Sequence, residues 1–180
     1  MRKEIFQTIE IPEGVEVKLE DSELIVKGKE GENKKKFNLS KIDFEIKDNK
    51  ITLGNKKSTK KEKKRINTFR AHIENMIKGV QEKFEYNLKV CFHHFPMTVT
   101  IREDDVEIKN FLGEKIPRIA RLPKGAEIKV DKEFITVTSI DKEIAGQAAA
   151  NLETATRITN KDRRVFQDGI FIINKAGKVM

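Results

Sequence analysis

The sequence predicts an α+β fold of two tandem, duplicated small domains, each a mostly antiparallel β-sheet packed against one main α-helix. Three features point to it: an internal repeat, short segments in which apolar and polar residues alternate, and two segments with apolar residues at helical spacing. Of the 180 residues, 37% are hydrophobic and 37% are charged. This balance favours thin cores under a charged surface, which suits two small domains better than one thick core.

The internal repeat is carried by several elements at one offset. Pro12 and Pro96 lie 84 positions apart, and each leads into a short β-like segment. The segments 51–53 and 135–137 match at the same offset. Since this period is too long for a solenoid unit, it indicates a duplicated domain. The expected domains are residues 1–82 and 83–180.

The strands are predicted from period-two patterning. Apolar and polar residues alternate in segments 15–20, 42–47 and 127–130, and acidic or Asn-containing turns separate such segments. This pattern is typical of antiparallel sheets with one buried face. Residues 86–92 either open the second domain or pair back to the first, and the sequence leaves both open. Each copy is expected to run through strands, a helix and a further strand.

The first helix is predicted from a capping box and an apolar face. Thr59 and Glu62 have the spacing of a capping box, and Gly79 is expected to end the helix. Six apolar residues recur at helical spacing from Ile66 to Val80. They are Ile66, Phe69, Ile73, Met76, Ile77 and Val80.

The second helix is predicted to have a face of smaller residues, from Ile140 to Ala155. Gly146 lies in its interior, where glycine costs about 1 kcal/mol relative to alanine. We therefore expect a close approach at that surface, by the sheet or by an RNA backbone.

No pattern in the sequence indicates an enzyme, and no cofactor is expected. A glycine-rich phosphate loop, a pair of catalytic carboxylates and a nucleophile elbow are all absent from the sequence. The nearest approach to a metal site is the run Cys91-Phe92-His93-His94. Zinc sites usually draw ligands from two spaced pairs, so the run is interpreted as a strand end and no metal is expected.

A cytoplasmic location is expected. Cys91 is the single cysteine, which excludes an intramolecular disulfide and favours an intracellular protein. The first residues do not resemble a signal peptide, and no apolar run approaches the length of a membrane span.

The formal charge of +8 suggests a polyanionic partner or a solvated basic surface. Seven basic residues lie between Lys56 and Arg65 against the single acid Glu62. Because lysine-rich runs are often only solvated, the sequence does not decide whether this run contacts RNA.

The C-terminal stretch 154–180 is the stronger candidate for RNA contact. Six basic residues in it face only Asp162 and Asp168, and three of the six are arginines, which grip phosphate bidentately. The predicted RNA-binding residues of this tail are Arg157, Lys161, Arg163, Arg164, Lys175 and Lys178. Arg118 and Arg121 form a smaller cluster with Lys115 and Lys124, which could extend the same surface. With 7% aromatic residues and no tryptophan, base stacking is expected to be minor, and recognition is expected to rest on phosphates and RNA shape.

Three stretches resemble the universal large-subunit ribosomal protein of the L-six family, in its archaeal form. They are IEIPEGV at 9–15, RAHIENMIKGV at 70–80, and AGQAAAN at 145–151 leading to DRRVFQDGI at 162–170. The last string is the most specific, and its FQDGI form is similar to the archaeal and eukaryotic branch. The resemblance covers essentially the whole chain.

The resemblance implies two similar α+β domains in a structural constituent of the large ribosomal subunit. It implies binding to large-subunit (23S-type) rRNA, mainly by the second domain, near the sarcin–ricin loop and the stalk base, where translation GTPases dock. Neighbouring large-subunit ribosomal proteins are the other expected partners, and neither a membrane nor a small-molecule substrate is expected. By position, the family's RNA contacts fall on the six tail residues named above. The alternative is a protein–protein adaptor with a generic basic surface.

Overall fold

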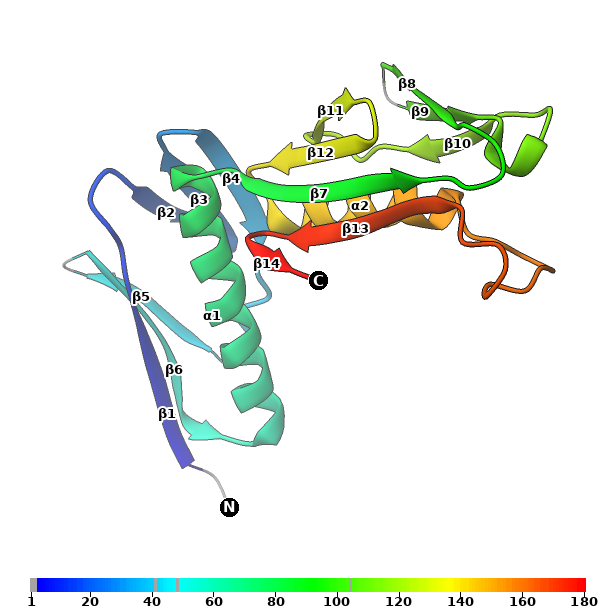
Figure 1. Cartoon of the computed structure of the whole chain (residues 1–180). Coiled ribbons are helices and arrows are strands. Elements are labelled where there is room, and N and C mark those ends of the chain that lie inside the picture. Colours follow the sequence, from blue (N-terminus) through cyan, green and yellow to red (C-terminus); the bar gives the residue numbers. More distant parts are fainter. Residues whose placement is uncertain (1–2, 41, 48, 104) are drawn as a thin grey trace. The chain divides into compact units, whose positions relative to one another are not determined.

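The computed structural model describes residues 3–40, 42–47, 49–103 and 105–180. The chain divides into two compact units, Met1–Lys83 and Phe84–Met180. Each contains antiparallel sheets and one main helix (Figure 1), so the predicted α+β class is confirmed. Neither helix in the described part of the chain has the length and apolar character of a membrane-spanning helix.

The first unit contains two three-stranded sheets and the helix α1 (Lys60–Gln81). One sheet has the order β1-β6-β5, formed by β1 (Lys3–Glu10), β6 (Lys50–Ser58) and β5 (Asp43–Lys47). The other has the order β2-β3-β4, formed by β2 (Glu16–Glu20), β3 (Glu23–Gly28) and β4 (Gly31–Lys36). The helix contacts strands of both sheets, so its apolar face closes one core between them.

The second unit contains a five-stranded sheet of order β11-β12-β7-β13-β14. Its strands are β11 (Glu127–Asp131), β12 (Phe134–Ser139), β7 (Phe84–Cys91), β13 (Gly169–Lys175) and β14 (Lys178–Val179). A three-stranded sheet of order β10-β9-β8 comprises β10 (Arg118–Arg121), β9 (Asp105–Lys109) and β8 (Thr98–Arg102), with the short helix η1 (Phe111–Gly113) between β9 and β10. The helix α2 (Lys142–Ala155) contacts β10 and three strands of the larger sheet.

The two units share one order of elements. In each, the first strand pairs with the strand before the helix, β1 with β6 and β7 with β12, and the latter strand pairs with β5 or β11. The three strands between them form a separate sheet. The matching segments 51–53 and 135–137 lie in the equivalent strands β6 and β12.

The strand β7 accounts for the segment 86–92 that the sequence left open. It lies within the second unit and pairs with β12 along one edge and with β13 along the other. The expectation of a further strand after the helix in both copies is wrong for the first copy, because the strand that follows α1 is β7. The second unit does have strands after its helix, namely β13 and β14.

The start of α1 is confirmed, and its expected end is wrong. Thr59 is the N-cap, its side chain accepts from the backbone of Lys61, and the reciprocal bond from its backbone to Glu62 completes the capping box. The helix continues through the buried Gly79 to Gln81, and its C-cap is extended. Gly79 therefore packs inside the helix instead of terminating it.

The glycine in α2 faces the sheet. A Cβ at Gly146 would lie 3.3 Å from the hydroxyl oxygen of Tyr86, on β7. Burial raises the pKa of that hydroxyl. A close approach by the sheet or by an RNA backbone is expected at this glycine, and the structure shows the approach of the sheet. Ile140 precedes the helix, which begins after the N-cap Asp141.

Candidate nucleic-acid interface

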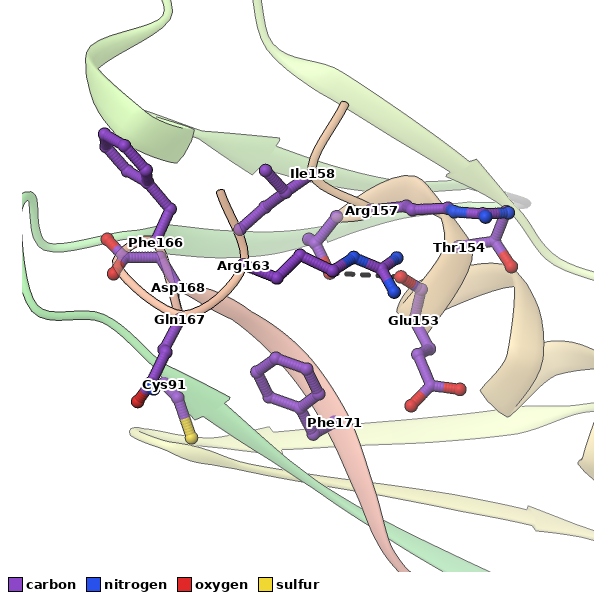
Figure 2. Close-up of a pocket in the computed structure, with 11 residues that line it drawn as sticks. Cys91, Glu153, Thr154, Arg157, Ile158, Arg163, Phe166, Gln167, Asp168 and Phe171 are labelled. Carbon is purple, nitrogen blue, oxygen red and sulfur yellow. Dashed lines mark hydrogen bonds between the residues drawn. The ribbon is translucent and has the colours of Figure 1, made fainter. Parts of the chain in front are cut away.

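A loop of residues 156–168 connects α2 to β13 and carries four of the basic residues that the sequence selects. Its start is fixed by the buried Thr156. Thr156 Oγ1 accepts the backbone N–H of Ile170 at 2.9 Å and donates to the backbone oxygen of Glu153 at 3.2 Å, the bond dashed in Figure 2. The chain therefore leaves the helix against the first residues of β13. The four basic residues are Arg157, Lys161, Arg163 and Arg164.

The end of the loop is fixed by Asp168, whose side chain is 1% exposed. Its carboxylate accepts the backbone N–H groups of His93 at 3.1 Å and His94 at 3.3 Å, and it lies 3.1 Å from Nδ1 of His94. Burial raises the pKa of this carboxyl, but the hydrogen bonds from His94 and the two backbone N–H groups lower it by more, so Asp168 is ionised. Since a carboxylate only accepts, His94 carries its proton on Nδ1.

An aromatic contact places Lys161. The rings of His94 and Phe166 are stacked with centroids 5.0 Å apart, and Nζ of Lys161 lies 4.7 Å from the Phe166 centroid. The ammonium group is therefore held by a cation–π contact at the tip of an anchored loop. Among the described residues, no group of three or more His, Cys, Asp or Glu side chains could hold a metal ion.

A hollow of about 770 Å³ lies beside this loop, at the end of α2 and the start of β13. Figure 2 shows Arg163 reaching from the loop toward the end of α2, with the Phe171 ring on the β13 side and Phe166 pointing away from both. The residues that line the hollow are Cys91, Glu153, Thr154, Thr156, Arg157, Ile158, Arg163, Phe166, Gln167, Asp168 and Phe171.

Two arginines beside the hollow are exposed. Neither Arg157 nor Arg163 forms an ion pair with any residue that the structure describes, whereas Arg164 lies 3.2 Å from Asp162. Hydrogen bonds from the backbone and side chain of Arg164 lower the pKa of the Asp162 carboxyl. The donors of Arg157 and Arg163 are thus available to an anion, and the fixed loop determines where they are presented.

Arg118 is held within the protein. Its guanidinium donates to the backbone oxygens of Ala155 at 2.9 Å and Arg157 at 3.1 Å, and it forms two bonds of 2.8 and 2.6 Å to Glu114. It also lies 4.2 Å from the centroid of the Phe111 ring. Arg118 therefore joins β10 to the carbonyl end of α2 and supports the start of the loop from inside the fold.

The remaining candidate residues lie away from the hollow. Arg121 occupies the other end of β10, where its backbone oxygen accepts from Asn151 at 2.8 Å. Lys175 and Lys178 lie opposite one another in the β13–β14 hairpin. The rise of an extended strand puts Lys175 about 20 Å from the start of β13. The structure thus gathers Arg157, Lys161, Arg163 and Arg164 on one loop and separates the two lysines from it.

The lysine-rich run lies in the first unit, on the end of β6 and the first turns of α1. Arg65 donates to the backbone oxygens of Asn38 at 2.8 Å and Ser40 at 3.4 Å. The side chains of Lys60, Lys61, Lys63 and Lys64 are exposed. They stand at the positive end of the helix dipole, where cations are unfavourable.

Four residues of the site were not selected from the sequence as binding or anchoring residues. In the sequence, Asp168 appears only as an acid among basic residues. Its hydrogen-bond partners His93 and His94 lie 75 and 74 positions away along the chain. Glu153 and Phe171 line the hollow, and Phe166 positions Lys161. The string at 162–170 includes two of these residues, but no local pattern joins it to α2 or to the histidines.

Comparison with known proteins finds one family model, described as "Ribosomal protein L6", that matches residues 11–83 and 95–169. The chain is 48% identical to the large ribosomal subunit protein uL6 of Methanobrevibacter smithii, over 95% of this chain and 96% of that protein. It is 43% identical to the protein of that name from Methanococcus vannielii, over 98% of this chain and 97% of that protein. The protein of that name from Methanosarcina mazei is 42% identical, over 98% of this chain and 100% of its own length.

Proposed function

Since the chain belongs to the ribosomal protein L6 family, and is thus a structural ribosomal protein and not an enzyme, we propose that its second unit binds and stabilises folded large-subunit rRNA. As a family member it is a component of the large subunit of the cytoplasmic ribosome. The proposed site on the rRNA is the region of the sarcin–ricin loop and the stalk base, beside the docking region of translation GTPases.

The single observation that carries this proposal is the anchored loop with two exposed arginines. Thr156 and Asp168 fix the two ends of the loop, so Arg157 and Arg163 are presented at set positions without an ion pair to any described residue. Because the backbone of the loop is already anchored, it loses little entropy when the arginines bind phosphate, and guanidinium donors match a phosphate bidentately. The loop therefore acts as a rigid clamp on RNA that is already folded.

The eight candidate contacts divide into four groups. We propose that Arg157, Lys161, Arg163 and Arg164 make the main contacts, and that Lys175 and Lys178 contact a separate stretch of backbone. Arg121 extends the surface along β10. Arg118 contributes chiefly by holding the start of the loop, since its donors already bond backbone and carboxylate oxygens.

Phosphate binding releases condensed counterions, so affinity should fall steeply with salt. Contact with about five phosphates gives a log–log slope of affinity against salt of about −4 to −5. Loss of two of these contacts moves the slope toward zero by about 2.

The test is binding of the full chain to large-subunit rRNA fragments across a salt series, with and without the sarcin–ricin region. The variant is Arg157→Ala/Arg163→Ala, and Lys129→Ala/Lys132→Ala is a control that removes the same charge from exposed positions of the same unit. We expect tight binding to the fragment with that region, weakened by the arginine variant and little changed by the control.

The adaptor alternative makes the opposite prediction. Equal, weak binding to every fragment, with a slope near zero and no effect of the arginine variant, would remove the rRNA proposal and favour a protein partner.

A further inference from the structure

We propose that the hollow beside the loop holds one unpaired nucleotide of the bound RNA, with its base on the ring of Phe171 and its phosphate against Arg157 and Arg163. The inference rests on the proposed rRNA binding and specifies what the site accepts. It departs from the expectation of minor base stacking, because the fold brings an exposed aromatic ring to the arginines.

The stacking surface is the ring of Phe171, which lines the hollow and is 42% exposed. The ring rests against Gly169, where a Cβ would lie 3.1 Å from its Cζ atom. The absence of a side chain at Gly169 thus gives the ring its position. A partly exposed ring fixed in this way is a platform for a base, and such stacking tolerates any base because each has a π-face.

The phosphate end of the hollow is formed by Arg157 and Arg163. Both line it, and neither forms an ion pair with a described residue. Two guanidinium groups beside an aromatic ring match the parts of a nucleotide, which carries its charge at one end and its flat base at the other.

Two further residues that line the hollow, Glu153 and Gln167, accept donors, and the carboxylate of Glu153 disfavours a second phosphate. The Glu153 carboxylate lines the hollow from α2, and Gln167 lines it from the loop. A carboxylate repels phosphate oxygens but accepts the N–H groups that a base presents on its Watson–Crick edge. These two acceptors thus favour a base over a run of backbone.

The size of the hollow also suits one nucleotide. Its volume of about 770 Å³ falls within the range of small-ligand pockets, about 300 to 1,000 Å³. A paired base cannot enter, because its Watson–Crick edge is engaged and both faces are stacked. The occupant is therefore a nucleotide turned out of a loop, bulge or strand end.

The first experiment compares Phe171→Leu with Phe134→Leu in the full chain bound to the rRNA fragment with the sarcin–ricin region. Phe134 lies on β12 of the same sheet, does not line the hollow, and is 49% exposed against 42% for Phe171. We expect Phe171→Leu to weaken binding by about 5-fold to 150-fold, the equivalent of stacking one base, at an unchanged salt slope. Phe134→Leu should leave affinity unchanged, and Phe171→Tyr, which keeps the ring, should bind as the unmodified protein does.

The second experiment measures occupancy directly. Cys91 is the only cysteine of the chain and lines the hollow, so its alkylation by iodoacetamide reports access to that space. We expect the alkylation rate to fall in proportion to the fraction of protein bound by the fragment. This readout needs no substitution, so it holds even where Phe171→Leu does not fold.

The outcomes separate the two proposals. No binding of the fragment by the unmodified protein overturns the proposed rRNA function, and the inference with it. Tight binding that Phe171→Leu and Phe134→Leu leave equally intact, or full alkylation of Cys91 at saturating RNA, overturns the nucleotide site alone. In that case the RNA passes over the opening of the hollow and no nucleotide enters it.

Discussion

At the scale of single residues, the loop of the candidate site is held at one end by a buried carboxylate. Asp168 receives three hydrogen bonds from the segment that follows β7, and it ends the loop that presents the arginines. In the charge count of the C-terminal stretch, Asp168 is a negative charge that would oppose RNA binding. In the folded chain it faces inward at 1% exposure, so it stabilises the loop and contributes little repulsion at the surface.

We expect Asp168→Asn to destabilise the protein by about 1.5–3 kcal/mol, the usual contribution of hydrogen bonds to a charged group. The amide keeps one acceptor but turns an NH₂ group toward donors. The measurement is urea unfolding at several pH values. Because the folded pKa of Asp168 is lowered, its contribution is present above its ordinary pKa of 3.8 and is lost as the pH falls further.

Asp162→Asn is the matched control for this prediction. Asp162 lies on the same loop and its pKa is also lowered, by hydrogen bonds from Arg164, but its side chain is 50% exposed. Exposed pairs contribute little, so its unfolding curve should match that of the unmodified protein. Equal effects of both substitutions would show that Asp168 does not anchor the loop.

At the scale of elements, the start of α1 is a point where sequence and structure agree. We expect Thr59→Ala to lower the free energy of unfolding by about 1 kcal/mol, because the capping box loses its side-chain acceptor. Thr68→Ala in the same helix is the control. Thr68 Oγ1 bonds the Lys64 carbonyl within the helix, and alanine has the higher helix propensity, so this change should be neutral or stabilising. Thermal melts of both variants compare them, and equal loss would exclude a capping role.

The sequence predicts correctly those features that depend on residues close together along the chain. Periodicity and the cap located α1, and alternation located strands such as β2, since these signals arise within one element. Gly79 was misinterpreted because a glycine ends a helix only in a left-handed conformation, which this residue does not adopt. The clustered arginines lie on one loop of the fold, and their role stays a prediction. The positions of Phe171 and Asp168 beside them depend on the pairing of β7 with β13, which no local pattern contains.

At the scale of the whole molecule, we propose that the two units are domains that fold independently. Among the described residues, those that form the core of the second unit all lie beyond residue 83, and they include Leu88, Ile135 and Leu152. Expressed alone, residues 84–180 should unfold cooperatively by circular dichroism and should bind the rRNA fragment with the salt slope of the full chain. Residues 1–83 alone should bind it weakly. A fragment 84–180 that lacks a cooperative transition would contradict the division.

The place of β7 also has a consequence for how the protein is made. This strand pairs along both edges, yet its partners β12 and β13 are translated well after it. During synthesis the backbone groups along both edges of β7 therefore stay unpaired until β12 and then β13 emerge. Other chains can pair with these edges in the meantime. The loop with Arg157 and Arg163 acquires its anchors only when β13 docks. A nascent chain thus gains the form that we propose binds RNA late, after nearly all of the second unit has been translated.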